Sequence, residues 1–141
     1  MKNSVREHCV AALLVGEIGS DRLFLHGVFR DAGWRLWEAP NRQRAMDCLT
    51  KRPVQVVISG TETSAWHWKG VLHDLRGLVH PPELIVTSRA ADDYLWAEVL
   101  NMGGYDVLPQ PFVRDEVEHV VAAARRQFER ASVPVAAVGA A

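Results

Sequence analysis

The stretch Pro53-Val-Gln-Val-Val-Ile-Ser-Gly60 decides the fold. It is largely apolar and β-branched and is bounded by proline and glycine, a pattern typical of a strand buried on both faces of a parallel sheet. In open parallel sheets, ligands and reacting groups lie just beyond the carboxyl ends of the strands. We therefore expect Ser59 to stand where any chemistry of the protein takes place.

Apolar runs and amphipathic segments alternate on both sides of this strand. Ser20 is suited to cap a helix and Gly33 to end it, and residues 34–39 alternate like an edge strand. The expected strands are 10–15, 34–39, 53–59, 83–87 and 105–108. The expected helices are 20–32, 41–51, 66–78, 91–102 and a last one after Pro111. The inward positions expected in the first helix are Leu25, Val28, Phe29 and Ala32, and those in the last are Val113, Val117, Val120, Val121, Ala124 and Phe128.

Five strands alternating with five helices predict a doubly wound α/β fold, because parallel strands need crossover connections and these are right-handed. The expected architecture is a flavodoxin-like, five-stranded parallel sheet with strand order 2-1-3-4-5. We expect one domain over residues 9–130, followed by a disordered tail over residues 131–141, which are small and apolar.

Composition excludes several classes of function. The chain has 141 residues, of which 48% are hydrophobic and 23% charged, and its net charge is -1. This balance gives no general attraction to nucleic acid or to an anionic membrane. Cys9 and Cys48 are too few for a disulfide framework and lack metal-ligand spacing. No apolar run is long enough to cross a membrane, so we expect a soluble, cytoplasmic protein.

Three stretches resemble the receiver domains of two-component response regulators. Residues 33–39, followed by Ala45-Met-Asp-Cys-Leu49, look like the second strand and helix of that family, and Pro53 to Ser59 looks like its central strand. The most specific stretch is Gly103-Gly-Tyr-Asp-Val-Leu-Pro-Gln-Pro-Phe112. The resemblance covers about Ala11 to Arg126, and it implies a cis peptide bond at Gln110-Pro111.

The resemblance also implies where the phosphorylation chemistry of the family would lie. Its phosphorylated aspartate falls on Ser59, and its Mg²⁺-binding acidic pair falls on Gly16 and Glu17. Its hydroxyl residue is matched by Thr87, its lysine by Gln110 and its aromatic switch by Val107, with Tyr105 two residues earlier on the same face. The residues of this degenerate pocket are Gly16, Glu17, Ser59, Thr61, Thr87, Val107, Gln110 and Pro111.

This pocket lacks what phosphorylation requires. Glu17, helped by the carbonyl of Thr61, makes at best a weak Mg²⁺ site, since Mg²⁺ prefers carboxylate and phosphate oxygens. An acyl phosphate cannot form on Ser59. A lysine left beside a missing carboxylate would cost roughly 3–5 kcal/mol, so we expect neutral Ser59 to face neutral Gln110. We expect no cofactor, no metal site and no enzymatic activity.

Simpler roles are also open to these residues. The hydroxyls of residues 59–64 can cap the following helix. Glu17 and Arg89 are expected to form an ion pair across the top of the sheet, and His67 is expected to be a surface residue rather than a metal ligand.

The function expected is that of an atypical receiver that binds a protein partner without phosphorylation. The interaction surface expected comprises Tyr94, Trp96 and Tyr105, because exposed aromatic residues are favoured at interfaces. The partner is a histidine kinase, a downstream effector or a second copy of the chain. Two alternatives remain. The domain receives a phosphoryl group at Ser59 or at Glu62, or its Ser/Thr loop and Trp66 hold a flavin or another phosphate ligand.

Overall fold

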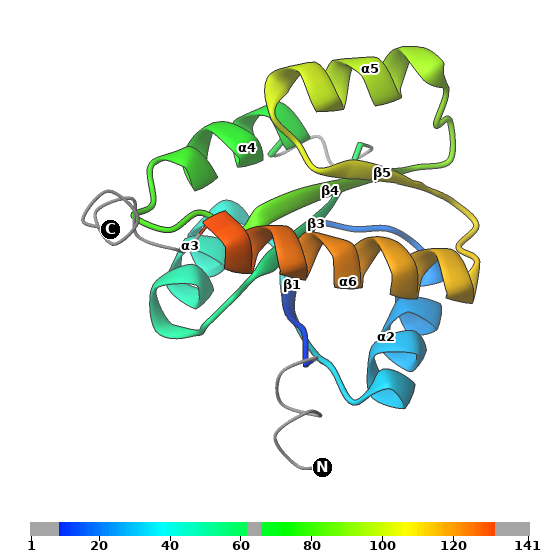
Figure 1. The fold of residues 1–141 in the computed structure, drawn as a ribbon, viewed down its shortest axis with the longest axis horizontal. Helices are drawn as coiled ribbons and strands as arrows, with labels where there is room; N and C mark the ends of the chain where they lie inside the picture. Colours follow the sequence, from blue (N-terminus) through cyan, green and yellow to red (C-terminus); the bar gives the residue numbers. More distant parts are fainter. Residues whose placement is uncertain (1–8, 62–65, 132–141) are drawn as a thin grey trace, which may run out of the picture.

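A computed structural model describes residues 9–61 and 66–131, and these form one layered α/β unit (Figure 1). Five parallel strands make one sheet in the order β2-β1-β3-β4-β5, which confirms the predicted flavodoxin-like topology. The strands are β1 (Ala11–Val15), β2 (Arg35–Ala39), β3 (Val56–Gly60), β4 (Glu83–Ser88) and β5 (Asp106–Pro109). The helices are α2 (Asp21–Ala32), α3 (Arg42–Lys51), α4 (Trp68–Arg76), α5 (Asp93–Met102) and α6 (Arg114–Ala131).

The apolar run that predicted the central strand forms β3, and all five of its residues are buried. It pairs with β1 on one side and β4 on the other, so both of its edges and both of its faces are covered. At the edge of the sheet, β2 is only partly buried, as its alternating pattern predicted. The carboxyl ends of β1, β3 and β4 therefore meet at the centre of one edge of the sheet.

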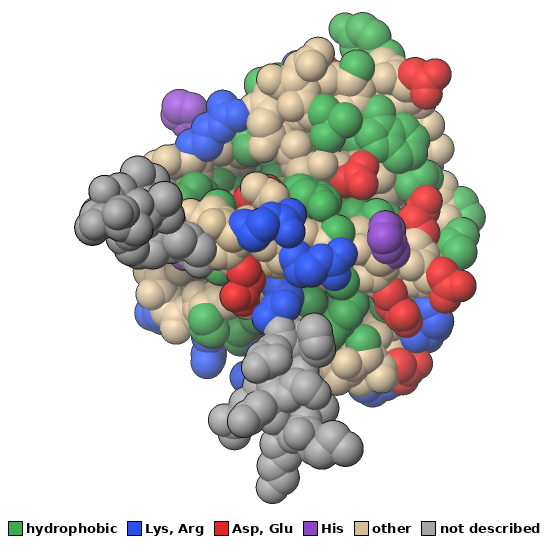
Figure 2. Space-filling model, in the orientation of Figure 1, with side chains coloured by type: hydrophobic (Ala, Val, Ile, Leu, Met, Phe, Trp, Pro, Cys, Tyr) green, Lys and Arg blue, Asp and Glu red, His purple; other side chains and the backbone are tan. Residues whose placement is uncertain are grey.

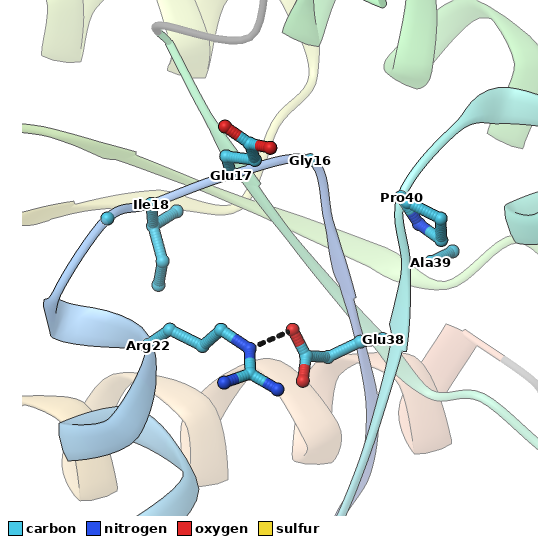
Figure 3. Close-up of a pocket in the computed structure, with 8 residues that line it drawn as sticks. Gly16, Glu17, Ile18, Arg22, Glu38, Ala39 and Pro40 are labelled. Carbon is cyan, nitrogen blue, oxygen red and sulfur yellow. Dashed lines mark hydrogen bonds and ion pairs between the residues drawn. The ribbon is translucent and has the colours of Figure 1, made fainter.

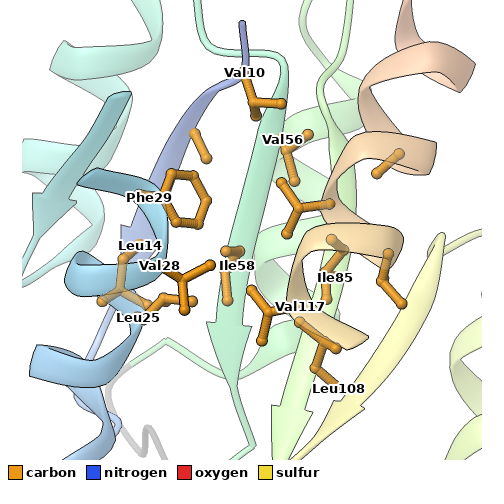
Figure 4. Packing of buried hydrophobic residues seen from close by; sticks show 14 of the residues in the cluster. Val10, Leu14, Leu25, Val28, Phe29, Val56, Ile58, Ile85, Leu108 and Val117 are labelled. Atoms are coloured by element: carbon orange, nitrogen blue, oxygen red, sulfur yellow. The ribbon is translucent and has the colours of Figure 1, made fainter. Parts of the chain in front are cut away.

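Two apolar clusters, one on each face of the sheet, hold the layers together. On one face, strand residues Val56, Ile58 and Ile85 belong to one buried cluster with Phe29 of α2 and Val117 of α6 (Figure 4). On the other face, strand residues pack against α3, α4 and α5, with Trp68 as the largest fully buried side chain. Since successive strand residues alternate between the faces, each buried strand contributes to both clusters.

Several helix ends follow the expected local rules. Gly33 ends α2 in a left-handed conformation with φ of 75°, which glycine adopts without steric cost. Asn41 caps α3 by accepting a hydrogen bond from the backbone N–H of Arg44. Ser20 does precede α2, but its side chain makes no capping hydrogen bond, because its backbone is already helical and not extended.

Some boundaries and inward positions differ from those predicted. α4 begins at Trp68 and not at Trp66, and α5 begins at Asp93 because Asp92 caps it by accepting from the N–H of Leu95. Val113 precedes α6, and its side chain is 60% exposed instead of packing inward. Ala32, the last residue of α2, is also exposed, because the chain leaves the helix there. Ala131 still belongs to α6, and the rest of the expected tail lies outside the described residues.

The visible surface of the domain carries acidic and basic side chains side by side (Figure 2). Neither sign of charge forms a large continuous area in this view. This mixture agrees with the net charge of -1. Among the described residues, no helix is long and apolar enough to span a membrane.

Candidate functional site at the carboxyl edge of the sheet

Ser59 lies inside β3 and is completely buried. Its neighbours in the sheet are Val15 of β1 and Val86 of β4, so it occupies the centre of the carboxyl edge, as the sequence predicted. Its hydroxyl donates to the carbonyl oxygen of Gly60 across 3.5 Å, the outer limit of a hydrogen bond. The hydroxyl is therefore not presented to solvent as an acceptor of a phosphoryl group would need to be.

Thr87 lies beside this position on β4 and is also fully buried. It stands opposite Gly60 in the register of the sheet, and its carbonyl accepts a hydrogen bond from the N–H of Thr61. Its hydroxyl oxygen has no hydrogen-bond partner within residues 9–61 and 66–131. The two hydroxyl residues that the sequence placed at the site are thus both enclosed, but their side chains lie on opposite faces of the sheet, because Ser59 is in register with Val86 and Thr87 with Gly60.

The loop between β1 and α2 closes the space beside Gly60 and the Thr87 hydroxyl. A Cβ atom added to Gly60 would lie 3.3 Å from Ile18 Cγ2 and 3.4 Å from the Glu17 carbonyl oxygen. Ile18 is 5% exposed and belongs to the core. An apolar side chain and a loop backbone therefore cover the end of β3, where a phosphoryl group would need open space.

Glu17, the only carboxylate expected at the metal site, is exposed. In Figure 3 its carboxylate points away from the pocket beneath the loop and away from Arg22. In the described part of the chain, no group of three His, Cys, Asp or Glu residues is arranged to hold a metal ion. The residues at this edge thus do not fit the Mg²⁺ that the family resemblance implied, since Mg²⁺ needs a nearly ideal octahedron of oxygen ligands.

Asp21, in the first turn of α2, is the residue that organises this edge, and the sequence analysis did not single it out. Its Oδ2 accepts a hydrogen bond from Arg89 across 2.6 Å and another from the Gln110 amide across 2.9 Å. The Asp21 side chain is only 16% exposed. We call Asp21, Arg89 and Gln110 the Asp21 clamp, because it joins the first turn of α2 to the loops that follow β4 and β5.

The clamp overturns two expectations. Arg89 pairs with Asp21 and not with Glu17, because the carboxylate of Glu17 turns outward. Gln110 does not turn its amide toward Ser59, since its nitrogen donates to the Ile18 carbonyl across 3.3 Å and to Asp21. An acidic residue directly after the predicted Ser20 cap, at the carboxyl edge, was the signal that could have identified the clamp.

The peptide bond between Gln110 and Pro111 is cis, as the family resemblance implied. Val107, the residue expected at the switch position, is buried in the cluster that includes Val99 of α5. Tyr105, however, packs against the cluster on the opposite face of the sheet. The expectation that these two residues share a face was wrong, because Tyr105 precedes the first residue of β5 and lies outside its regular alternation.

Only part of the predicted interaction surface is exposed to solvent. Tyr94 is 78% exposed. Trp96 instead packs against the core, and its ring N–H donates to Asp106 across 2.7 Å. His67 is exposed and caps α4 by accepting from the N–H of Lys69. Glu62 and the hydroxyl residues at 63 and 64 lie outside the described residues, so their predicted roles stay predictions.

A pocket that sequence reasoning missed lies between the β1–α2 loop and the end of β2. It is open, has a volume of about 510 Å³ and is shown in Figure 3. Arg22 donates to Glu38 across 2.6 Å along its floor, and His26 contacts the other Glu38 oxygen at 2.7 Å. The hydrogen bond from Arg22 lowers the pKa of the Glu38 carboxyl. The pocket is lined by Gly16, Glu17, Ile18, Gly19, Arg22, Glu38, Ala39 and Pro40.

Comparison with solved structures places the fold among receiver domains. The receiver domain of Francisella response regulator 1452 is 18% identical with a TM-score of 0.71, and the match covers 84% of this chain and 98% of that one. The signal receiver domain of an HD domain-containing protein from Pseudomonas fluorescens Pf-5 is 20% identical with a TM-score of 0.74, and the match covers 86% of this chain and 98% of that one. The signal receiver domain of a putative LuxO repressor from Vibrio parahaemolyticus is 16% identical with a TM-score of 0.75, and the match covers 86% of this chain and 93% of that one.

The comparisons at the level of sequence found no match, either with a family model or with a curated protein. The likeness therefore concerns the fold, which is that of a response regulator receiver domain. The fold does not by itself determine what the site does.

Proposed function

We propose that the domain is a receiver-type signalling module that binds a protein partner without being phosphorylated. The observations that carry this proposal are the Asp21 clamp, which joins the loops at the carboxyl edge, and the burial of Ser59. In the receiver family, the loops at the carboxyl edge respond to a phosphoryl group and a metal ion. Here, side chains of the protein itself already join those loops, so their arrangement does not depend on an added ligand.

The chemistry at the edge supports the same proposal. A hydroxyl cannot replace a carboxylate in forming an acyl phosphate, and burial of Ser59 keeps a serine kinase from reaching it. The carboxylate of Asp21 already accepts two hydrogen bonds, which leaves it poorly placed as a metal ligand. We therefore expect neither phosphoryl transfer nor Mg²⁺ binding, and no catalysis.

The partner surface proposed is the outer face of α5, with Tyr94 as its aromatic anchor. Tyr94 and Leu100 are 78% and 51% exposed, so α5 presents two large apolar side chains to solvent. Tyrosine offers a large contact area with little loss of conformational freedom on binding. The partner class is a histidine kinase or a downstream effector of a two-component pathway.

A labelling experiment tests the proposal directly. The protein is incubated with acetyl phosphate and Mg²⁺ and its intact mass is measured, beside a receiver domain that retains its aspartate as the positive control. The proposal predicts the mass of the unmodified chain. A mass increase of one phosphoryl group, abolished by Ser59→Ala, would show that phosphorylation persists at this position and would overturn it.

A further inference from the structure

Arg22, on the floor of the pocket in Figure 3, has hydrogen-bonding capacity that the chain does not use. Its Nε donates to one oxygen of Glu38 across 2.6 Å, but the other Glu38 oxygen already contacts His26 at 2.7 Å. Arg42 shows the ordinary alternative, since it donates to both oxygens of Asp74, from Nε across 2.7 Å and from Nη2 across 3.4 Å. The two terminal nitrogens of Arg22 thus donate to no residue in the described part of the chain, although Arg22 lines an open pocket.

The β1–α2 loop, which lies across the pocket from this floor in Figure 3, adds backbone donors. Gly16 is fixed to the end of β2, because its N–H donates to the Ala39 carbonyl across 3.1 Å. The N–H groups of the next three residues, Glu17, Ile18 and Gly19, have no hydrogen-bond acceptor among the residues described. Successive backbone N–H groups in a turn can bind an anion. The pocket therefore has hydrogen-bond donors on its floor and on its loop side.

Glu38 provides hydrogen-bond acceptors in the same pocket. The hydrogen bond from Arg22 lowers the pKa of its carboxyl, so the group is ionised at neutral pH. Each of its oxygens has one partner, whereas a carboxylate can accept about four hydrogen bonds, so it can also accept from hydroxyl groups of a ligand. In dinucleotide-binding α/β folds, an acidic residue about 20 residues after a glycine-rich loop binds ribose hydroxyls. Glu38 follows Gly16 at a similar spacing.

We propose that this pocket binds a ribose phosphate ester, with its phosphate on the donors of Arg22 and the loop and its hydroxyls on Glu38. A phosphate has three acceptor oxygens and so matches these donors better than a carboxylate does. The volume of about 510 Å³ is in the range of small-molecule sites. Pro40 is exposed at the rim, so a nucleotide base can extend past it, and a nucleoside monophosphate and free ribose 5-phosphate share this chemistry. The ligand is bound and not transferred, on the β2 side of the loop, and the site does not depend on the proposed function.

Amide NMR titrations of the whole chain with ribose 5-phosphate, adenosine monophosphate, adenosine and inorganic phosphate test this proposal. Ribose 5-phosphate is expected to shift the signals of Ile18, Gly19 and Ala39 saturably, with a dissociation constant of about 1 mM or lower, and to leave Ser59 unchanged. Equal affinity for adenosine monophosphate would support a sugar phosphate as the unit recognised, and tighter binding would support a nucleotide. No saturable shift with either ester would overturn the proposal. So would adenosine or inorganic phosphate binding as tightly as the esters.

Two variants test the assigned contacts separately. Arg22→Gln is expected to weaken binding of ribose 5-phosphate about tenfold, and it should stay folded because the Arg22 side chain is 50% exposed. The matched control is Arg42→Gln, which removes another exposed guanidinium paired with a carboxylate and should leave binding unchanged. Glu38→Gln should weaken binding of ribose 5-phosphate but not of inorganic phosphate, since it alters the contacts to the hydroxyls. Binding of ribose 5-phosphate by Arg22→Gln or by Glu38→Gln as tightly as by the wild type would contradict the proposal.

Discussion

The side-chain amide of Gln110 donates a hydrogen bond to the carboxylate of Asp21 across 2.9 Å, although 89 residues separate them in the chain. The bond joins the loop after β5 to the first turn of α2. Arg89, in the loop after β4, donates to the same carboxylate oxygen. The carboxyl edge of the sheet is therefore closed by interactions within the chain.

Removing the carboxylate of Asp21 should destabilise the domain. Asp21→Ala leaves Arg89 and the Gln110 amide without their shared acceptor and removes a favourable charge from the first turn of α2, at a cost of about 1–3 kcal/mol. Asp93→Ala is the matched control, because Asp93 is an exposed acidic residue in the first turn of α5 with no partner for its side chain in the described structure. Equal losses in the free energy of unfolding for the two variants, measured in urea, would show that the clamp contributes nothing to stability.

Adding a methyl group at Gly60 tests how closely the β1–α2 loop covers β3. The new Cβ in Gly60→Ala would lie 3.3 Å from Ile18 Cγ2 and 3.4 Å from the Glu17 carbonyl oxygen, so the loop must move. We expect a loss of about 1–3 kcal/mol in the free energy of unfolding, as for other insertions into packed sites. A variant as stable as the wild type in urea unfolding would indicate that the loop lies farther from the strand.

The pH dependence of stability should include a contribution from Asp74. Its Oδ2 accepts hydrogen bonds from Arg42 across 2.7 Å and from Trp66 across 3.0 Å. The bond from Arg42 is the main cause that lowers the pKa of this carboxyl in the folded protein. Because the folded-state pKa lies below the unfolded one, the contribution is complete above the ordinary aspartate range, near pH 4, and is lost as the pH falls through the folded-state pKa.

The variant Asp74→Asn isolates this contribution. At neutral pH it should be less stable than the wild type in urea unfolding, and the difference should shrink as the pH is lowered below about 4. Other acidic groups, such as Glu38, titrate in both proteins and cancel in the comparison. A difference that does not change between neutral and acidic pH would contradict the assignment.

Tyr94 and Trp96, two residues apart on α5, should respond differently to truncation. Trp96→Ala removes core packing and the hydrogen bond to Asp106, so it should cost about 2–4 kcal/mol in urea unfolding. Tyr94→Ala should change stability by less than about 0.5 kcal/mol, because the side chain is 78% exposed. Binding of a partner by the α5 surface should be lost in Tyr94→Ala. A large loss of stability in this variant would show that the Tyr94 side chain is packed against the domain.

The fold could be predicted because its signals are local and strong. The buried run of β3, the edge pattern of β2 and the glycine that ends α2 each determine one element, and parallel strands joined by helices then restrict the topology. The cis peptide bond before Pro111 could also be predicted. That prediction came from the resemblance of residues 103–112 to receiver domains and not from hydrophobic periodicity.

The side-chain partners at the site could not be predicted in the same way. Glu17, Asp21 and Arg89 all lie in loops or first turns at one edge of the sheet, and sequence order does not reveal which carboxylate the arginine reaches. Trp96 is similar, since helical spacing left its direction open and the buried hydrogen bond to Asp106 decides it. Contacts between distant loops depend on backbone geometry that a single sequence does not contain.

We propose that the carboxyl edge functions without a metal ion or a phosphoryl group. A two-dimensional amide NMR titration with Mg²⁺, followed by beryllofluoride as a phosphoryl mimic, tests it most directly at Glu17, Ser59, Thr61, Thr87 and Gln110. These amide signals are expected not to shift beyond the change caused by the same ionic strength of NaCl. Saturable shifts confined to these residues would instead show that the edge still binds a phosphoryl-like ligand.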